Sequence, residues 1–189
     1  DKGLVISDEL VRNDLKLISK YTNCIRTYST VGLEMIPRIA RENNLTMLMG
    51  AWVNGDEKPT RKEIDTLIKL VNENKDIVKA VIVGNEALLR GDLSDVKLSE
   101  YIKEVKTALP DIQVTYADVW EYWVKYPEIK NLTDFVTIHI LPYWEDDPMN
   151  ISESIKHLAE VRHEVEGILG TSNILIGETG WPSEGRMRE

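Results

Sequence analysis

Two short segments decide the fold class. Residues 81–86 read Val81-Ile82-Val83-Gly84-Asn85-Glu86, and residues 174–178 read Ile174-Leu175-Ile176-Gly177-Glu178. Each segment is a continuously apolar run that ends in a glutamate. Continuous rather than alternating apolar character is typical of a parallel strand that is covered on both faces. A purely structural sequence would usually place a turn-forming residue after such a strand, so each glutamate is also a candidate functional group.

Six runs of this kind occur along the chain, and we expect each to be a strand. They are Cys24–Tyr28, Thr46–Trp52, Val78–Asn85, Gln113–Ala117, Phe135–His139 and Ile174–Glu178. Segments with the apolar spacing of helices lie between them. This alternation predicts an α/β protein with a parallel sheet.

Four helices have recognisable signals at their ends. Ser7 is expected to cap the first helix, and Thr60-Arg61-Lys62-Glu63 has the pattern of a capping box at the start of the second. Pro110 should end the third helix, and Gly170 lies just past the end of the fourth.

The βα units repeat about every 30 residues, which suits either a doubly wound sheet or a (β/α)8 barrel. Neither of the glycine-rich phosphate-binding patterns of doubly wound sheets occurs in the chain. The strands instead end in polar and aromatic residues, and a barrel gathers such strand ends on one face. These residues are Arg26, Tyr28, Trp52, Asn85, Glu86, Asp118, His139 and Glu178. The sequence therefore favours a TIM barrel.

The composition narrows the class of function. The 189 residues carry a net charge of −9, which argues against nucleic acid as a partner, because phosphate binding needs clustered lysine and arginine. No apolar run approaches the ~18 residues of a membrane span. The single cysteine, Cys24, excludes a disulfide framework, and His157 and His163 are poorly spaced as shared metal ligands. We expect no metal and no cofactor.

Glu86 and Glu178 lie 92 residues apart, which corresponds to about three βα units and places them across the mouth of a barrel. Two facing carboxyl groups are what glycoside hydrolysis needs, one as general acid and one as nucleophile. The alternative is that each glutamate caps a helix or pairs with an arginine. The sequence does not give the distance that separates retaining from inverting enzymes.

Four ordered motifs resemble those of glycoside hydrolase family 17, the β-1,3-glucanases and β-1,3-glucan transglycosylases, in their bacterial or fungal style. The motifs are Val83-Gly84-Asn85-Glu86, Gly177-Glu178-Thr179-Gly180-Trp181-Pro182-Ser183, Arg26-Thr27-Tyr28-Ser29 and His139-Ile140-Leu141-Pro142-Tyr143-Trp144-Glu145. The family belongs to a large retaining clan with catalytic glutamates on strands four and seven.

The resemblance implies roles for four residues. Glu86 would be the acid/base and Glu178 the nucleophile. Asn85 would hydrogen-bond the sugar 2-hydroxyl, and Arg26 would lie beneath Glu178 and keep it ionised. The implied substrate is a β-glucan oligosaccharide or polysaccharide, which favours a secreted or cell-envelope location.

Aromatic residues near the strand ends are candidate sugar contacts, because pyranose rings bind to flat aromatic faces. Trp52, Trp120, Trp144 and Trp181 fall just past strands, although packing beneath loops is the alternative, above all for Trp120 and Trp123. Tyr28, Asp118, Tyr143 and Glu145 are candidate partners for sugar hydroxyls. His139 is either a hydrogen-bonding residue of the site or a core histidine.

Three alternatives to a hydrolase of β-1,3-glucan stay open. The first is a transglycosylase that uses the same two glutamates. The second is a non-catalytic glucan-binding fragment. The third is an enzyme that acts on another β-glucan.

The chain is also short for its fold. A (β/α)8 barrel typically needs ~250 residues, and only six strands are predicted. If Glu86 ends the fourth strand and Glu178 the seventh, then strands two to seven are present and the first and eighth are missing. We therefore expect residues 1–189 to be one partial barrel domain. Its open edges would favour self-association unless further chain or a partner closes the barrel.

Overall fold

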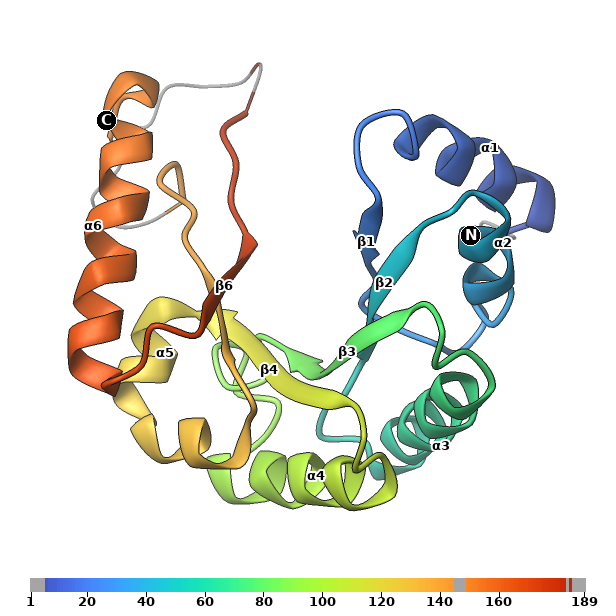
Figure 1. Ribbon diagram of the computed structural model, residues 1–189. Helices are drawn as coiled ribbons and strands as arrows, with labels where there is room; N and C mark the ends of the chain where they lie inside the picture. Colours follow the sequence, from blue (N-terminus) through green and yellow to red (C-terminus); the bar gives the residue numbers. More distant parts are fainter. Residues whose placement is uncertain (1–5, 145–148, 183, 185–189) are drawn as a thin grey trace.

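The structure, a computed structural model, describes residues 6–144, 149–182 and 184. Within this part of the chain, six parallel strands form one curved sheet in sequence order (Figure 1). The strands are β1 (Cys24–Arg26), β2 (Thr46–Ala51), β3 (Val78–Asn85), β4 (Gln113–Val119), β5 (Val136–His139) and β6 (Ile174–Glu178). All six predicted strands are therefore confirmed, with small differences at their ends.

Helices cover the outer, convex side of the sheet (Figure 1). They are α1 (Asp8–Ile18), α2 (Ile36–Glu42), α3 (Glu57–Glu73), α4 (Asp95–Ala108), α5 (Trp120–Lys125), the 3-10 helix η1 (Pro127–Leu132) and α6 (Ile151–Leu169). The core lies between these helices and the sheet, where Ile64, Leu67, Ile102 and Val165 are fully buried. None of the described helices is long and apolar enough to cross a membrane.

The strand order excludes the doubly wound alternative. A doubly wound sheet reverses its strand order at a switch point and carries helices on both faces. Here every strand pairs in parallel with the next one in the sequence, and the helices share one face (Figure 1). The arrangement is that of part of a TIM barrel.

The predicted helix ends hold at three places and fail at one. The Ser7 side chain accepts a hydrogen bond from the Leu10 amide at 3.2 Å. Helix α4 ends at Ala108, shortly before Pro110, and α6 ends with Gly170 in the left-handed conformation, at φ 63°. The capping box at Thr60 is wrong, because α3 begins one turn earlier.

The residue that caps α3 is Asp56, whose side chain accepts a hydrogen bond from the Lys58 amide. Thr60 lies inside the first turn, and its hydroxyl bonds both backbone groups of Asn54. Glu63 does not reach back to the helix start, but turns into the protein. The residues Thr60 and Glu63 have the spacing of a capping box, but Asp56 caps the helix instead, because an aspartate side chain is a stronger N-cap than a threonine.

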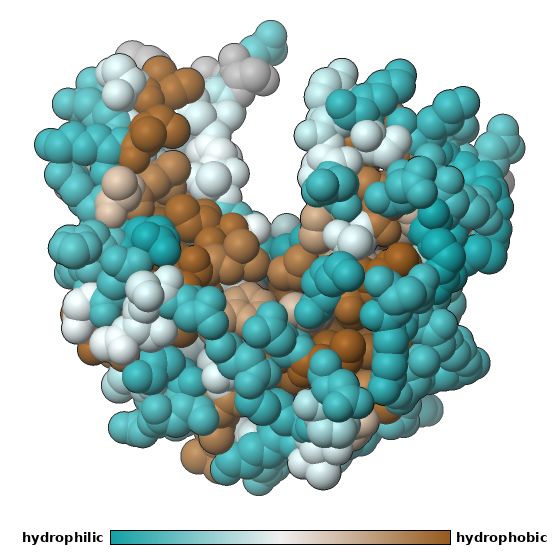
Figure 2. Space-filling view, viewed as in Figure 1, coloured by the Kyte–Doolittle hydropathy of each residue, from teal (hydrophilic) through white to brown (hydrophobic). Residues whose placement is uncertain are grey.

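The curved sheet ends at β1 and β6 within the described residues. Large apolar side chains are exposed on α6 and β6 at one end of the sheet, and on α1 and the segment before β1 at the other. Figure 2 shows apolar surface on the arm that carries α6 and β6. The exposed residues are Ile151, Ile155, Ile168 and Leu175 near β6, and Leu10, Leu17, Ile18 and Tyr21 near β1.

A buried glutamate connects α3 to the segment that follows β1. The Glu63 carboxyl group accepts hydrogen bonds from the Thr30 amide at 2.8 Å, the Thr30 hydroxyl at 2.9 Å and the Val31 amide at 3.2 Å. The Ser29 hydroxyl donates to it at 2.5 Å, and the Trp52 amide lies 3.4 Å away. This one side chain therefore fixes the loop after β1 relative to the end of β2.

We expect Glu63→Gln to lower the free energy of unfolding by about 1–3 kcal/mol, because an amide cannot accept all of these hydrogen bonds and leaves buried donors unpaired. Urea denaturation followed by circular dichroism measures the change. Glu73→Gln, on the exposed face at the end of the same helix, serves as control and should shift stability by less than about 0.5 kcal/mol. Equal effects of the two substitutions would contradict this role of Glu63.

Candidate active site

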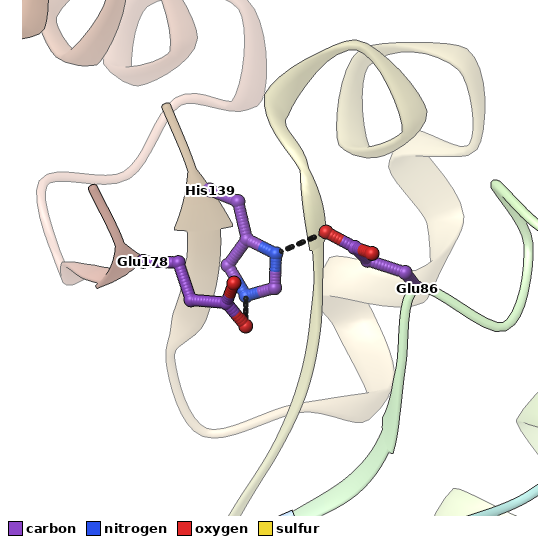
Figure 3. Close-up of side chains that lie close together, drawn as sticks. All are labelled: Glu86, His139 and Glu178. Carbon is purple, nitrogen blue, oxygen red and sulfur yellow. Dashed lines mark hydrogen bonds and ion pairs between the residues drawn. The ribbon is translucent and has the colours of Figure 1, made fainter. Parts of the chain in front are cut away.

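The structure brings Glu86 and Glu178 together at the carboxyl edge of the sheet. Glu86 directly follows β3, and Glu178 is the last residue of β6. One carboxylate oxygen of each lies within 4.8 Å of the other and of a His139 ring nitrogen. The three side chains come from separate strands and converge on one point (Figure 3).

A pocket of about 540 Å³ opens at this point. Its lining joins the two glutamates to mostly apolar side chains, namely Leu89, Val119, Leu141 and Trp144, together with the acidic Glu121. The volume falls in the range of small-ligand sites, which typically enclose ~300–1,000 Å³. Two carboxyl groups in a partly apolar pocket of this size can take part in acid/base or nucleophilic chemistry on a bound molecule.

His139 bridges the two glutamates. Its side chain is fully buried, and Nδ1 lies 2.7 Å from Glu86 Oε1, while Nε2 lies 3.3 Å from Glu178 Oε1 (Figure 3). The sequence left two interpretations of this histidine open, a hydrogen-bonding residue of the site and a buried core residue. The structure combines them, because the ring is buried and contacts both glutamates.

Arg26, at the end of β1, reaches across to β3, β5 and β6. Its Nη1 donates to the Gly177 carbonyl at 2.8 Å and lies 3.4 Å from Glu178 Oε1 and 3.2 Å from His139 Nε2. Its Nη2 donates to Asn85 Oδ1 at 2.6 Å. The rigid fork of a guanidinium suits this set of partners, which a lysine could not serve together.

A glycine lies one residue before Glu178 and two residues before Glu86, in each case for a steric reason. A Cβ on Gly177 would lie 2.6 Å from Thr137 Cγ2 and 2.9 Å from Arg26 Nη1, so a larger residue would displace the arginine. Gly84 has φ +89°, and a Cβ there would lie 2.7 Å from Val53 Cγ2. Glu86 itself has φ 50°, in the left-handed region of the backbone. Residues other than glycine adopt this conformation at an energetic cost, and such residues are frequent at functional sites.

Electrostatics in the site favour a charged Glu86. The hydrogen bond from His139 lowers the pKa of Glu86. The positive charges of Arg90 and Arg26 lower it further, whereas partial burial of the carboxyl group raises it. A general acid needs a raised pKa, so the lowered pKa of Glu86 is opposite to what is expected of an acid in its resting state. Burial lowers the pKa of Arg26 and raises the pKa of Tyr28.

The aromatic candidates take different places around the site. Trp144 lines the pocket and is 57% exposed. The Tyr143 ring packs edge-on against both Trp144 and Trp181, at centroid distances of 4.8 and 5.5 Å. These three rings form one cluster next to the glutamates. Glu145 lies outside the described residues.

Two further aromatic candidates stack on arginines instead. The Arg26 guanidinium lies 4.6 Å from the centre of the Tyr28 ring, and the Arg90 guanidinium lies 4.3 Å from the centre of the Trp52 ring. Arg90 also donates to the Asn85 carbonyl oxygen. These contacts connect both rings to residues beside Glu86 and Glu178.

Asp118 is placed behind the site rather than in the pocket lining. It is fully buried, and it accepts hydrogen bonds from the Tyr116 hydroxyl, the Val119 amide and the Leu89 amide. Burial raises its pKa. The Tyr116 hydroxyl also accepts from the Leu88 amide at 2.9 Å, so the pair supports the turn that follows Glu86.

For two tryptophans after β4, packing prevails. Trp123 is buried and donates from Nε1 to the Thr137 carbonyl at 2.8 Å, and Trp120 packs against the core. Sequence reasoning missed the apolar lining residues Leu89, Val119 and Leu141, and the charged lining residue that it missed is Glu121. Its position one residue into a helix that starts directly after β4 was a usable signal, but α5 is too short to show helical periodicity.

Glu86, His139 and Glu178 also offer the ligand types of a metal site. The Arg26 guanidinium, however, contacts both His139 and Glu178. A fixed positive charge at that position opposes a divalent cation, so the site suits proton chemistry better than metal binding. The expectation of no metal stays a prediction.

Comparisons with known proteins identify the family of the chain. Residues 1–189 match the family described as the BtgE/BtgC glycoside hydrolase domain. A "Glucan 1,3-beta-glucosidase" of Schizosaccharomyces pombe is 29% identical over 188 residues, which cover 91% of this chain. A "Putative glucan endo-1,3-beta-glucosidase btgC" of Aspergillus niger is 30% identical over 197 residues, which cover 95% of the chain. The chain spans 59% of the length of the first relative and 28% of the second.

Solved structures show the same likeness. The glycoside hydrolase family 17 β-1,3-glucanosyltransferase of Rhizomucor miehei superposes with a TM-score of 0.83 and 28% identity, over 97% of this chain and 69% of that one. An active-site mutant of that enzyme, solved in complex with laminaritriose, has the same TM-score. An endo-laminarinase from Formosa, at 19% identity and a TM-score of 0.81, shares the fold. The chain belongs to the BtgE/BtgC glycoside hydrolase domain family, within glycoside hydrolase family 17.

Proposed function

We propose that the protein is a retaining glycoside hydrolase that acts on β-1,3-glucan, with Glu86 as acid/base and Glu178 as nucleophile. The observation that carries this proposal is the approach of the two carboxylates to within 4.8 Å beside an open pocket. Retaining enzymes hold their carboxyl groups ~5–5.5 Å apart, whereas inverting enzymes keep them ~6.5–9.5 Å apart to admit a water. The short separation supports a nucleophile rather than a general base for water.

The reaction then has two steps. In the first, a Glu178 oxygen bonds to the anomeric carbon, the glycosidic C–O bond breaks, and the Glu86 proton passes to the leaving oxygen. In the second, Glu86 takes a proton from an incoming hydroxyl, whose oxygen bonds to the anomeric carbon and releases Glu178. Water as the acceptor gives hydrolysis, and a sugar hydroxyl gives transfer.

Arg26 and Asn85 would assist from fixed positions. Arg26 holds the Glu178 carboxylate while its second nitrogen occupies Asn85 Oδ1. That contact orients the Asn85 amide and leaves its NH2 group to donate to a sugar 2-hydroxyl, a hydrogen bond that strengthens in the transition state. The Arg90 contact to the Asn85 backbone supports the same orientation.

We assign sugar stacking to the ring cluster of Tyr143, Trp144 and Trp181. Trp144 is the exposed member that lines the pocket next to the glutamates. Tyr28, Trp52 and Glu145 stay proposed contacts around this cluster. Asp118 is better explained as support for the turn after Glu86, because its oxygens are already bonded.

Transfer to a second sugar is the alternative outcome of the same chemistry. The pocket walls are mostly apolar, and an apolar wall excludes water in favour of a sugar face. The Rhizomucor miehei structure with a TM-score of 0.83 is named as a glucanosyltransferase.

We further propose that the six strands correspond to strands two to seven of an eight-stranded barrel, within one domain. Glu86 follows the third strand and Glu178 ends the sixth, which is the three-strand separation of the family's catalytic glutamates. The exposed apolar side chains near β1 and β6 support covering by further structure. Self-association through these edges stays a prediction.

Glu178→Ala and Glu86→Ala should each reduce reducing-sugar release from laminarin by about 10³-fold or more, as removal of a nucleophile or its proton donor does in other enzymes. Azide separates the two roles. In Glu178→Ala it should attack directly and give the α-glucosyl azide. In Glu86→Ala it should replace the acceptor after the covalent step and give the β-glucosyl azide. NMR of the isolated product assigns the anomer.

Glu160→Ala is the matched control, since Glu160 is an exposed glutamate on α6 that is 62% accessible. Its activity should equal that of the wild type. Full activity in Glu178→Ala, or the same azide anomer from both glutamate variants, would overturn the assignment. Laminarin binding without product from the wild type would instead identify a non-catalytic binding fragment.

Mass spectrometry of the products from laminaripentaose separates hydrolysis from transfer. We expect shorter oligosaccharides to dominate at low substrate concentration, with longer ones increasing as the sugar competes with water as acceptor. Products longer than the substrate at every concentration would establish a transglycosylase. Cleavage of a cellulose or mixed-linkage oligosaccharide in preference to the laminari-oligosaccharide would contradict the proposed linkage.

A further inference from the structure

His139 has no role in the two-step reaction described above, yet it contacts both glutamates. Its side chain is fully buried, and each ring nitrogen has a polar partner. Gly177 is adjacent to the ring, since a Cβ at that position would lie 3.2 Å from His139 Cδ2. The ring is therefore held from β1, β3 and β6 in a single orientation.

Arg26 is the group that favours a proton-free Nε2 in His139. Its Nη1 is 3.2 Å from His139 Nε2, and a guanidinium can only donate hydrogen bonds. The Glu178 Oε1 acceptor lies 3.3 Å from the same nitrogen, slightly farther than Arg26. When Arg26 donates to Nε2, that nitrogen accepts and carries no proton. In a neutral ring the proton is consequently on Nδ1, where it points to Glu86 Oε1 at 2.7 Å. A donor at this distance pairs best with an ionised carboxylate.

We propose that His139, held by Arg26 as the neutral tautomer with its proton on Nδ1, is a positioning residue that stabilises the ionised form of Glu86. The inference rests on the proposed acid/base role of Glu86. In the two-step reaction Glu86 must be ionised when it takes a proton from the acceptor. His139 thus favours the second step and opposes early protonation of Glu86.

Other charged groups face this pair from neighbouring elements. Arg26 lies at the end of β1, Arg90 after β3, Asp118 on β4 and Glu178 on β6. Tyr28 faces Arg26 and Glu178. The His139 hydrogen bond is the largest cause of the lowered pKa of Glu86. Removal of this donor, with the other groups unchanged, should therefore raise the pKa of Glu86.

The pH dependence of kcat/KM on a laminari-oligosaccharide tests this inference. Activity should fall at alkaline pH as Glu86 loses its proton. In His139→Phe, which has a ring of similar size and no donor, this alkaline limb should move upward by about one pH unit. The direction follows because a higher pKa keeps Glu86 protonated to higher pH.

Two amide variants separate the hydrogen bond from simple packing. The asparagine amide lies near the position of Nδ1, so His139→Asn can donate to Glu86 and should return the alkaline limb towards that of the wild type. The glutamine amide lies near the position of Nε2, so His139→Gln should behave like His139→Phe. An unmoved limb in His139→Phe, or the same limb in the asparagine and phenylalanine variants, would overturn the proposal.

The tautomer can be read without any activity. Two-bond ¹H–¹⁵N NMR distinguishes a proton on Nδ1 from one on Nε2, and the chain has only three histidines. His157 and His163 lie on α6 and serve as internal references. We expect the Nδ1-protonated form for His139 at neutral pH. A proton on Nε2, or on both nitrogens, would overturn the proposal.

The two tests also separate failure of this inference from failure of the proposed function. If Glu86→Ala retains activity on laminarin, the acid/base assignment fails whatever the tautomer of His139. If Glu86→Ala is inactive and gives the β-glucosyl azide, the assignment holds. An unmoved alkaline limb in His139→Phe then refutes the role of His139 alone.

Discussion

The site depends on the guanidinium of Arg26. This side chain starts on β1 at one edge of the sheet and contacts Glu178 on β6 at the other edge. Such a contact is impossible across a flat six-stranded sheet, because neighbouring strands lie ~4.8 Å apart. The curvature visible in Figure 1 turns the two edges towards each other, so that the Arg26 side chain can reach Glu178. Arg26 thereby joins Asn85, His139 and Glu178, so that fold and site share one interaction.

The structure around Arg26, Glu86 and Glu178 accommodates three charged groups at one partly buried point. The Arg26 side chain is only 14% exposed, and four partners of Nη1 and Nη2 offset part of its loss of hydration. Its Nε is buried without a hydrogen-bond partner among the described residues. Gly177 leaves space for its Nη1. The register of β3 with β4 shifts between Ile82 and Asn85, directly before the left-handed Glu86. Behind that turn, Tyr116 and Asp118 bind the amides of residues 88 and 89. Strain at Glu86 is thus balanced by buried hydrogen bonds.

Much of this arrangement was readable from the sequence. Continuous apolar runs located all six strands, and the glutamate after each of two runs identified the paired carboxyl groups. Short elements were missed, since seven-residue α2 and six-residue α5 show too little periodicity. Thr60 was misread because Asp56 offered a better cap. The roles of His139 and Asp118 depend on register and burial, which one sequence does not contain.

The central claim is that Glu178 forms a covalent bond to the sugar. A 2-deoxy-2-fluoro laminaribiosyl fluoride slows both steps but carries a leaving group that needs no acid, so the glycosyl-enzyme should accumulate. Intact-mass and peptide mass spectrometry then locate the label. The account predicts one added disaccharide, on Glu178. Label on Glu86, or turnover of the reagent without any covalent species, would contradict it.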